Sequence, residues 1–230
     1  MNNIIELKDI YKSYPQPNEE ENLSIISELN LEVEQGKSIS IIGKSGCGKS
    51  TLLQIAASLL KPSSGQVLFN NKNLIKLNDK ELCKIRNKEM GFIFQNSLLL
   101  EDFSALENIM MPLLINNVSK RRAKDRAIYL LDEIGLTNRI NHKPSQLSGG
   151  EKQRIALARA LSINPKVIFA DEPTGSLDEE NAQYVEDLLL NLVDKESVTL
   201  ILVTHNLSFA SRCDRVVKLT HGRINEELSE

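Results

Sequence analysis

The chain has 230 residues, of which 41% are hydrophobic, and it carries a formal net charge of −3. This length fits one domain, or one domain with a small inserted subdomain, and the hydrophobic content excludes a disordered chain. The negative charge argues against DNA or RNA as the main partner, because surfaces that follow a phosphate backbone need a basic excess.

The sequence contains no apolar run of about 18–20 residues, the length that a membrane-spanning helix requires. Its start, MNNIIELKDI, has neither the basic lead nor the long apolar stretch of a signal peptide. We therefore expect a cytosolic protein, and any membrane role would have to come through another subunit. Cys47, Cys83 and Cys213 lack metal-ligand spacing, which favours free thiols in a reducing compartment.

Short apolar runs bounded by turn residues predict strands along most of the chain. In chain order these strands are Ile4–Ile10, Ile25–Val33, Ser38–Ile42, Met90–Phe94, Val167–Ala170, Leu200–Val203 and Val216–Leu219. The first two are separated by Pro15–Asn22, a loop with two prolines and an acidic triplet, Glu19–Glu21.

Helices are predicted between these strands. Apolar residues on a 3.6-residue period predict the first helix from Leu52 to Leu60, with its end at Lys61-Pro62. The other predicted helices are Ser119–Ile134, Glu151–Leu161 and Glu179–Val193. Residues 96–146 show helical patterns only. We therefore expect a single α/β domain, 1–230, with a core of 1–95 and 147–230 that includes the N-terminal strands, and an inserted helical subdomain at 96–146.

A phosphate-binding loop is predicted between the strand Ser38–Ile42 and the first helix. It matches the pattern G-x-x-x-x-G-K-[ST] in the residues Gly43, Lys44, Ser45, Gly46, Cys47, Gly48, Lys49 and Ser50. The glycines let successive N–H groups turn toward phosphate oxygens, and the helix N-terminus adds the positive end of its dipole. We expect Lys49 to bridge the β- and γ-phosphates, Ser50 to bind Mg²⁺ and Thr51 to reach the α-phosphate.

Two carboxylates, Asp171 and Glu172, end the apolar run Val167–Ala170. Because ligands bind at the carboxyl ends of strands in open α/β sheets, we expect both beside the phosphate-binding loop. Adjacent residues of a strand point in different directions, so we expect Asp171 in the Mg²⁺ shell and Glu172 as the acceptor for the attacking water. His205 ends the run Thr199–Thr204, and we expect it to contact the γ-phosphate.

A third motif places Ser148, Gly149 and Gly150 at the predicted start of the helix Glu151–Leu161. A serine and two glycines at a helix N-terminus can bind an anion. Because the first loop already holds the nucleotide, a second phosphate-binding edge indicates that two copies of the chain close on shared ATP.

With these three motifs in order, the sequence resembles the nucleotide-binding subunits of ABC transporters from about Ile4 to Ile224. The resemblance implies ATP and Mg²⁺ as cofactors, ATP hydrolysis, an ATP-dependent homodimer, and integral-membrane permease subunits that hold the chain at the cytoplasmic face of the inner membrane. It also implies a P-loop NTPase core with a mostly parallel sheet, an N-terminal antiparallel β subdomain and the helical insertion.

The resemblance implies further site residues. Gln95 matches the glutamine that joins the Mg²⁺ and water shell, and Asp178 matches the dimer-interface loop. Tyr14 matches the aromatic residue that stacks on adenine, with Tyr11 as an open alternative. Glu151 stands where many members have glutamine, and we interpret it as a tolerated variant.

The segment 95–114 is similar to the branch of the family that serves lipoprotein release, macrolide and peptide export, and cell division, and most of all to the lipoprotein-releasing ATPase. This predicts a transporter motor. The alternatives are a cell-division signalling ATPase and an exporter of macrolides or peptides. DNA-repair and chromosome-structure ATPases are disfavoured, because Lys49 and Asp171 are only 122 positions apart with no long heptad array between them.

The apolar run Leu98–Leu100 begins three residues after Gln95. We expect part of this run to be open to solvent and to receive a short cytoplasmic helix of a permease.

Overall fold

The computed structural model describes residues 2–16 and 22–226, so most of the loop expected at Pro15–Asn22, with its acidic triplet, lies outside the described residues. The chain divides into two compact units. The first comprises residues up to Cys83 together with those from Thr199 onward, and the second comprises Lys84–Val198. The helical subdomain expected at 96–146 was bounded by sequence pattern, whereas these two units are bounded by contacts within the structure. The subdomain boundaries therefore stay a prediction.

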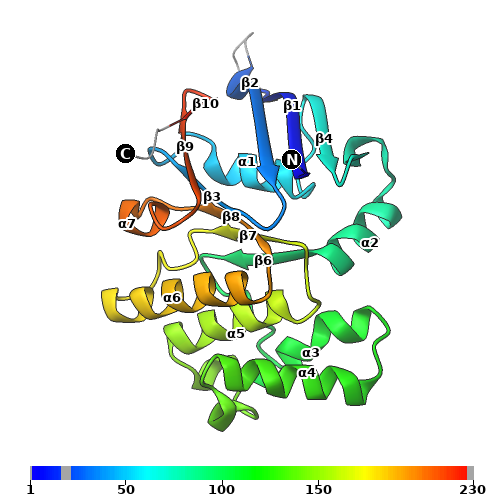
Figure 1. Cartoon of the computed structure of the whole chain (residues 1–230), viewed down its shortest axis with the longest axis vertical. Helices are drawn as coiled ribbons and strands as arrows, with labels where there is room; N and C mark the ends of the chain where they lie inside the picture. Colours follow the sequence, from blue (N-terminus) through cyan, green and yellow to red (C-terminus); the bar gives the residue numbers. More distant parts are fainter. Residues whose placement is uncertain (1, 17–21, 227–230) are drawn as a thin grey trace. The chain divides into compact units, whose positions relative to one another are not determined.

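The first unit contains an antiparallel sheet with strand order β2-β1-β4-β5 (Figure 1). Its strands are β1 (Asn3–Tyr14), β2 (Leu23–Glu34), β4 (Ser64–Phe69) and β5 (Lys72–Asn73). Along β2 the residues Leu29, Leu31 and Val33 are buried and alternate with exposed ones, as a half-buried sheet requires.

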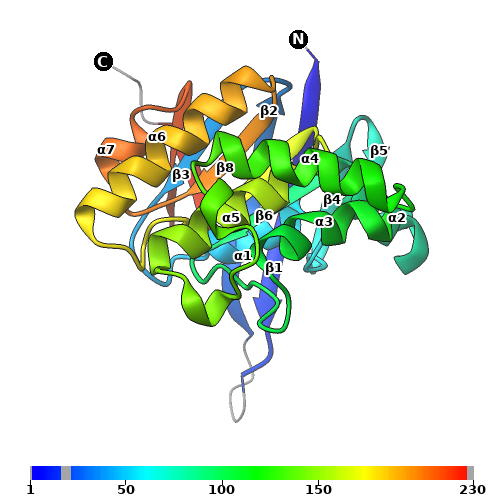
Figure 2. The same cartoon turned by 90° about the horizontal axis from the view of Figure 1, so that it is seen from below.

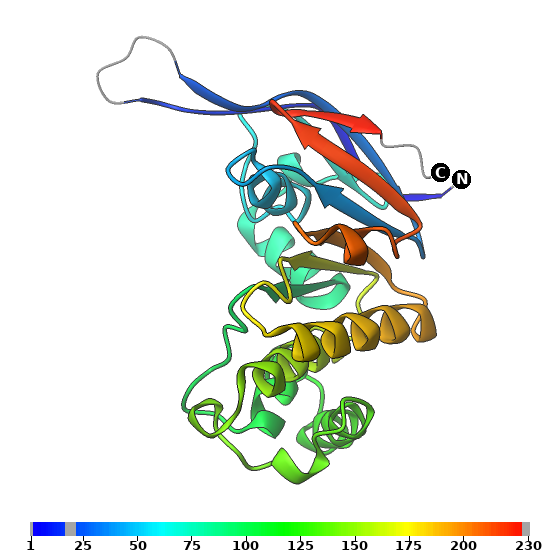
Figure 3. The ribbon, with the colours of Figure 1, turned by 90° about the vertical axis from the view of Figure 1, so that its left-hand side faces the viewer.

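The first unit also contains parallel strands. The buried strand β3 (Ser38–Ile42) pairs in parallel with β8 (Thr199–Val203) on one side and β9 (Arg215–Thr220) on the other. The strand β10 (Arg223–Glu226) pairs antiparallel with β9, and Figure 3 shows this hairpin beside the long β1–β2 ribbon. The backbone N–H of Ser27 donates to the Gly222 carbonyl at 3.0 Å, which joins the hairpin to β2.

Among the described residues, two α-helices lie wholly within this unit, α1 (Lys49–Ala56) and α7 (Leu207–Ala210). The prediction that the first helix continues to Leu60 was wrong. Ser58 has a φ of 53°, a left-handed value that no α-helix continues, and the N–H groups of Leu59 and Leu60 both turn back to the Gln54 carbonyl.

The second unit is built around two parallel strands, β6 (Met90–Phe94) and β7 (Val167–Asp171). Its helices are α3 (Ala105–Ile115), α4 (Lys120–Glu133), α5 (Gly149–Leu161) and α6 (Glu179–Lys195), with 3₁₀ turns at Thr137–Arg139 and Pro144–Gln146 (Figure 2). Residues 96–146 contain helices and no strand, as their pattern predicted. The helix α2 (Asp79–Glu89) runs from the first unit into the second.

The protein is thus an α/β structure with an antiparallel N-terminal sheet, a set of mostly parallel strands and several helices. The strand β4 and the helix α2 carry too little apolar pattern to be found in the sequence, and α2 has no buried residue. In the described part of the chain, no helix combines the length and the hydropathy of a membrane span.

Candidate functional site

The phosphate-binding loop, residues 43–48, joins β3 to the start of α1. Gly48, just before the helix, has a φ of 99°, which is accessible to glycine and strained for other residues. A Cβ at Gly48 would lie 2.8 Å from the Ile25 side chain in β2, and one at Gly43 would lie 2.5 Å from the Leu219 carbonyl in β9. Larger side chains at these two positions would therefore push the loop away from the neighbouring strands.

The side chain of Lys49 lies buried within this loop. Its Nζ donates to the carbonyl oxygens of Gly43 at 3.0 Å and of Lys44 at 3.2 Å. The first N–H groups of α1 have no partner further back in the helix, so they carry the positive end of its dipole toward the same loop. An ammonium group and a helix N-terminus at one loop form a site suited to phosphate.

His205 lies at the edge of the sheet where this loop begins. Ile41 of β3 pairs with Val203 of β8, and the N–H of Thr204 donates to the Ile41 carbonyl at 3.4 Å. Continuing the same parallel register sets His205 level with Gly43. This register places His205 beside the start of the loop, and its contact with a γ-phosphate stays a prediction.

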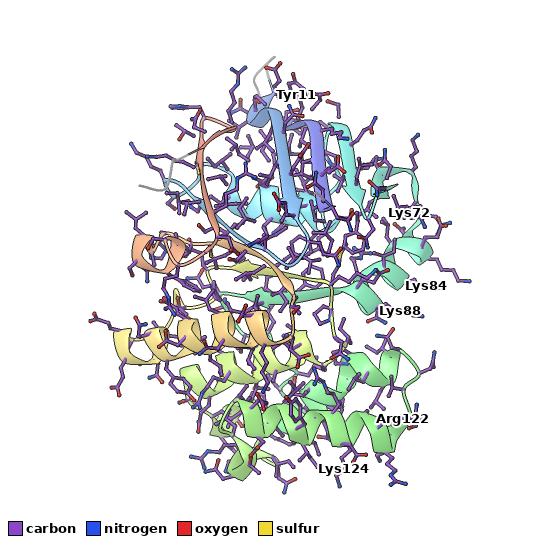
Figure 4. The ribbon with its side chains drawn as sticks, in the orientation of Figure 1. Tyr11, Lys72, Lys84, Lys88, Arg122 and Lys124 are labelled. Carbon is purple, nitrogen blue, oxygen red and sulfur yellow. The ribbon has the colours of Figure 1, made fainter. Side chains whose placement is uncertain are left out.

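The two candidate adenine-stacking residues are equally accessible. The side chain of Tyr14 is 39% exposed, and that of Tyr11, labelled in Figure 4, is 41% exposed. They differ in their surroundings, because Lys12 Nζ lies 4.8 Å from the centre of the Tyr14 ring. Exposure alone does not choose between them, and both stay candidates.

In the second unit, Asp171, Glu172 and Gln95 lie together at the carboxyl ends of β6 and β7. They are the residues predicted for the metal, the attacking water and the glutamine switch. Phe94 of β6 pairs with Asp171 of β7, so Gln95 and Glu172 are the next residues of the two parallel strands. Glu172 has a φ of 47°, a left-handed value that costs a non-glycine residue about 1–2 kcal/mol. Backbone strain of this kind is concentrated at functional sites.

The residues after Glu172 fold back onto Gln95. The N–H of Gly175 donates to the Glu172 carbonyl at 3.0 Å, and Ser176 Oγ donates to the Gln95 carbonyl at 3.1 Å. A Cβ at Gly175 would lie 3.1 Å from the Gln95 amide nitrogen. Glycine at this position therefore lets the Gln95 side chain pack against the turn that follows Glu172.

The motif Ser148–Gly150 forms the N-terminus of α5. Ser148 is the N-cap residue, and its Oγ accepts the N–H of Glu151 at 3.2 Å. A Cβ at Gly150 would lie 2.6 Å from the Asn181 side chain, and Asn181 Nδ2 in turn donates to Asp178 at 2.8 Å. The structure thus brings Asp178 and the motif together within one chain.

Glu151 stabilises the start of α5 in two ways. Its Oε2 accepts the N–H of Ser148 at 2.8 Å, which completes a capping box, and its Oε1 accepts from Arg139 Nε at 2.8 Å. The Ser148 backbone bond, followed by the Arg139 guanidinium, lowers the pKa of this carboxyl below its usual range. A glutamine at this position could also complete the capping box, but only the carboxylate adds an ion pair with Arg139.

Two residues of α5 that were not predicted hold the segment around Gln95. Gln153 is buried, and its Nε2 donates to the Phe94 carbonyl at 2.9 Å. Arg159 donates to the carbonyls of Leu98 at 2.7 Å and Ser97 at 2.8 Å. Neither residue stood out in the sequence, because a polar residue of an amphipathic helix is normally assigned to the solvent face.

The apolar run after Gln95 is only partly open. The side chains of Leu98 and Leu100 are 59% and 43% exposed, whereas Leu99 is 8% exposed. The prediction of an accessible apolar patch is thus confirmed for two of the three leucines.

Oxygen donors suited to Mg²⁺ occur in both units. They are the hydroxyl of Ser50 in the first unit, and the amide oxygen of Gln95 and the carboxylate of Asp171 in the second. Within residues 2–16 and 22–226 the structure shows no group of three or more His, Cys, Asp or Glu side chains arranged to hold a metal ion. All three cysteines have free thiols, as predicted, and burial raises the pKa of Cys213 to about 11.

Comparisons with known proteins agree with this arrangement. The family model described as "ABC transporter" matches residues 26–175. The chain is 45% identical over 224 residues to the lipoprotein-releasing system ATP-binding protein LolD of Geobacter metallireducens, covering 97% of this chain and 99% of that protein. It is 44% identical over 225 residues to the ABC transporter ATP-binding protein YbbA of Escherichia coli K12, covering 98% of each.

A solved structure is similar over almost the same length. The ATP-binding cassette MJ0796, in a dimeric post-hydrolysis state bound to ADP and Pi, superposes with a TM-score of 0.87 at 36% identity. The match covers 98% of this chain and 100% of that chain.

Proposed function

The chain belongs to the ABC transporter family as one of its ATP-hydrolysing subunits, and from this premise we propose that it powers a separate permease that releases lipoproteins from the inner membrane. The observation that carries the proposal is the 45% identity to a LolD protein over 97% of the chain. Each part of the proposal can be assigned to residues of this chain.

ATP binding is assigned to the first unit. The loop Gly43–Gly48 and the N-terminus of α1 would hold the phosphates, with Lys49 on the β- and γ-phosphates and Thr51 near the α-phosphate. The burial of Lys49 within the loop supports this role. Tyr14 or Tyr11 would stack on the adenine, and His205 would contact the γ-phosphate.

Hydrolysis is assigned to Glu172, Gln95 and Asp171 together with Lys49. Ser50, Gln95 and Asp171 would hold Mg²⁺, which when bound neutralises charge on the phosphate oxygens. Glu172 would orient the attacking water and accept its proton, while Gln95 would help to place that water. The left-handed backbone of Glu172 supports a role that a regular strand residue could not perform.

A second copy of the chain would complete each ATP site. Ser148, Gly149 and Gly150 of the partner copy would face the γ-phosphate, and Asp178 would lie at the dimer interface. The exposure of Ser148 and Gly149 at the N-terminus of α5 supports this role, because the Gly149 N–H belongs to the first turn of the helix and can meet an anion there. The proposal of a dimer is also supported by the similar MJ0796 cassette, which is dimeric with ADP and Pi bound.

The permease would hold the subunit peripherally at the cytoplasmic face of the inner membrane. Leu98 and Leu100 would receive a short cytoplasmic helix of the permease, because two exposed leucines within five residues of a switch residue offer an apolar contact. Movement of Gln95 with the state of the nucleotide would then become movement of the membrane subunit.

Depletion of the subunit in its own cell tests the substrate. We expect lipoproteins destined for the outer membrane to accumulate in the inner membrane, and a permease to co-purify with the tagged subunit. Normal lipoprotein sorting would contradict the proposal. A division defect would then favour the cell-division signalling ATPase, and sensitivity to macrolides would favour the exporter. This test is needed because the YbbA relative, at 44% identity, has a name that states no substrate.

A further inference from the structure

Basic residues are concentrated in two segments of the second unit. Residues 84–89 and 120–126 together contain eight lysines or arginines and two carboxylates, although the whole chain has a net charge of −3. Six of these cations are exposed and form what we call the basic surface. Its residues are Lys84, Lys88, Lys120, Arg121, Arg122 and Lys124.

The two segments lie on the same side of the second unit. Figure 1 shows the end of α3 between the C-terminal half of α2 and the first turns of α4, and Figure 4 shows Lys84, Lys88 and Arg122 along that side. The end of α3 joins them, because Asn116 donates from Nδ2 to the Asn87 carbonyl at 2.5 Å.

Exposed apolar side chains adjoin the basic surface. Leu114 and Ile115, the last two residues of α3, are 37% and 58% exposed, and they directly precede Asn116. A surface that combines clustered cations with a few exposed aliphatic side chains is suited to the boundary between lipid headgroups and acyl chains.

Two other charged residues of these segments have partners inside the protein. Glu89 pairs with Lys166 at 2.7 Å. Arg126 donates to Asn164 at 2.6 Å and lies 3.4 Å from Glu196. In the described part of the chain, by contrast, the six residues of the basic surface form no ion pair, so their charges face solvent.

The position of three of these cations opposes helix stability. Lys120, Arg121 and Arg122 occupy the first turn of α4, which contains no acidic residue. The positive end of the helix dipole lies there and repels them. Three consecutive cations at an unfavourable position indicate a role other than stabilising α4.

We propose that the basic surface binds the phosphate groups of anionic phospholipids in the cytoplasmic leaflet, next to the permease. The proposal rests on the proposed function, because only a subunit held at a membrane would keep this surface near lipid. Ammonium and guanidinium groups donate to phosphate oxygens, and Leu114 and Ile115 would enter the headgroup layer.

The test is co-sedimentation of the full chain, without permease, with vesicles of phosphatidylglycerol and phosphatidylethanolamine. We expect binding at low salt, loss of binding at high salt, and no binding to pure phosphatidylcholine vesicles. Arg121→Gln/Arg122→Gln should weaken binding about 30-fold, since each basic residue near an anionic membrane contributes about 1 kcal/mol. The same variant should keep or raise the melting temperature, because it removes charges that the dipole of α4 repels.

Lys143→Gln/Lys195→Gln is the matched control. This variant also removes two positive charges, but at the opposite ends of α3 and α4. Lys143 follows His142, whose carbonyl accepts the N–H of Ala105 at the start of α3. Lys195 pairs with Glu133 at the end of α4. Equal weakening by this control, or equal binding of the wild type to neutral and anionic vesicles, would overturn the proposal. Tighter binding to an RNA oligonucleotide than to anionic vesicles, measured at the same ionic strength, would also overturn the proposal. ATP hydrolysis with the permease is measured separately, so these outcomes leave the proposed function standing.

Discussion

Arg159 donates from Nη1 to the backbone carbonyl of Leu98 at 2.7 Å, and from Nη2 to that of Ser97 at 2.8 Å. Arg159 lies near the end of α5, the helix that begins at the Ser148–Gly150 motif, while Leu98 follows Gln95 by three residues. Burial lowers the pKa of the Arg159 guanidinium, although arginine stays charged at neutral pH. One helix thus carries the motif at its start and holds the segment after Gln95 near its end.

Replacing Arg159 should destabilise the protein through these two carbonyls. Arg159→Leu should lower the free energy of unfolding by about 2 kcal/mol, because two hydrogen bonds to a charged group are lost and the one to the Ser97 carbonyl is part-buried. Arg159→Lys should recover part of this loss, since an ammonium group keeps the charge but lacks the planar fork. Urea denaturation measures both. If lysine were no better than leucine, packing rather than hydrogen bonding would explain the contribution of Arg159.

The ion pair of Glu151 predicts a stability difference that depends on pH. The folded-state pKa of Glu151 is lowered from its ordinary value of 4.5, so its contribution is present above that pH and lost as the pH falls below it. Glu151→Gln keeps the capping box but loses the pairing with Arg139, and it should cost about 0.5–1 kcal/mol at pH 7. Urea denaturation from pH 7 to pH 3 should show this difference shrinking toward zero. A constant difference would mean that the charge of Glu151 is not responsible.

The sequence predicted the elements that carry apolar pattern and the residues that follow them. Asp171 and Glu172 stand where an apolar strand ends, and the parallel register of β6 and β7 then brings Gln95 beside them. The helix α2 was not found, because none of its residues is buried and no apolar period marks it. The first helix was predicted too long, because its apolar period continues to Leu60 although Ser58 turns the backbone left-handed. Local φ values and contacts such as that of Arg159 depend on packing that no spacing reveals.

The proposed role of Glu172 predicts that binding and hydrolysis of ATP can be separated. Glu172→Gln should keep ATP affinity near that of the wild type and slow hydrolysis about 10²–10⁴-fold, because an amide cannot accept the proton of the attacking water. Lys49→Ala should weaken ATP binding itself. Nucleotide titration and single-turnover hydrolysis, with the permease present, measure the two effects. Wild-type turnover by Glu172→Gln would remove Glu172 from the role of base.

A composite site made by two copies predicts complementation between inactive variants. Ser148→Arg places a bulky side chain where the γ-phosphate of the partner copy would lie, whereas Lys49→Ala damages the site of its own chain. In a mixed dimer both lesions fall in one composite site and the other site is intact. Mixing the two inactive proteins should therefore restore part of the ATPase rate. A second measurement is light scattering of Glu172→Gln with saturating Mg-ATP, where a strictly monomeric species would contradict the dimer.

Docking of the permease at the leucines after Gln95 gives the last prediction, and the structure supplies its control. Leu98 and Leu100 are exposed and Leu99 is buried between them, so the same substitution at neighbouring positions should have opposite effects. Leu98→Asp and Leu100→Asp should leave the melting temperature and ATP binding of the isolated subunit near wild type, because a surface carboxylate stays hydrated. Both should abolish co-purification with the permease or uncouple hydrolysis from transport.

Leu99→Asp should instead lower the stability of the isolated subunit by several kcal/mol, since a buried carboxylate is left without a partner. Single cysteines at positions 98 and 100 should cross-link to the cytoplasmic loops of the permease. If they do not, while a cysteine at the exposed Tyr184 of α6 cross-links readily, the permease docks elsewhere and Gln95 is not its direct neighbour.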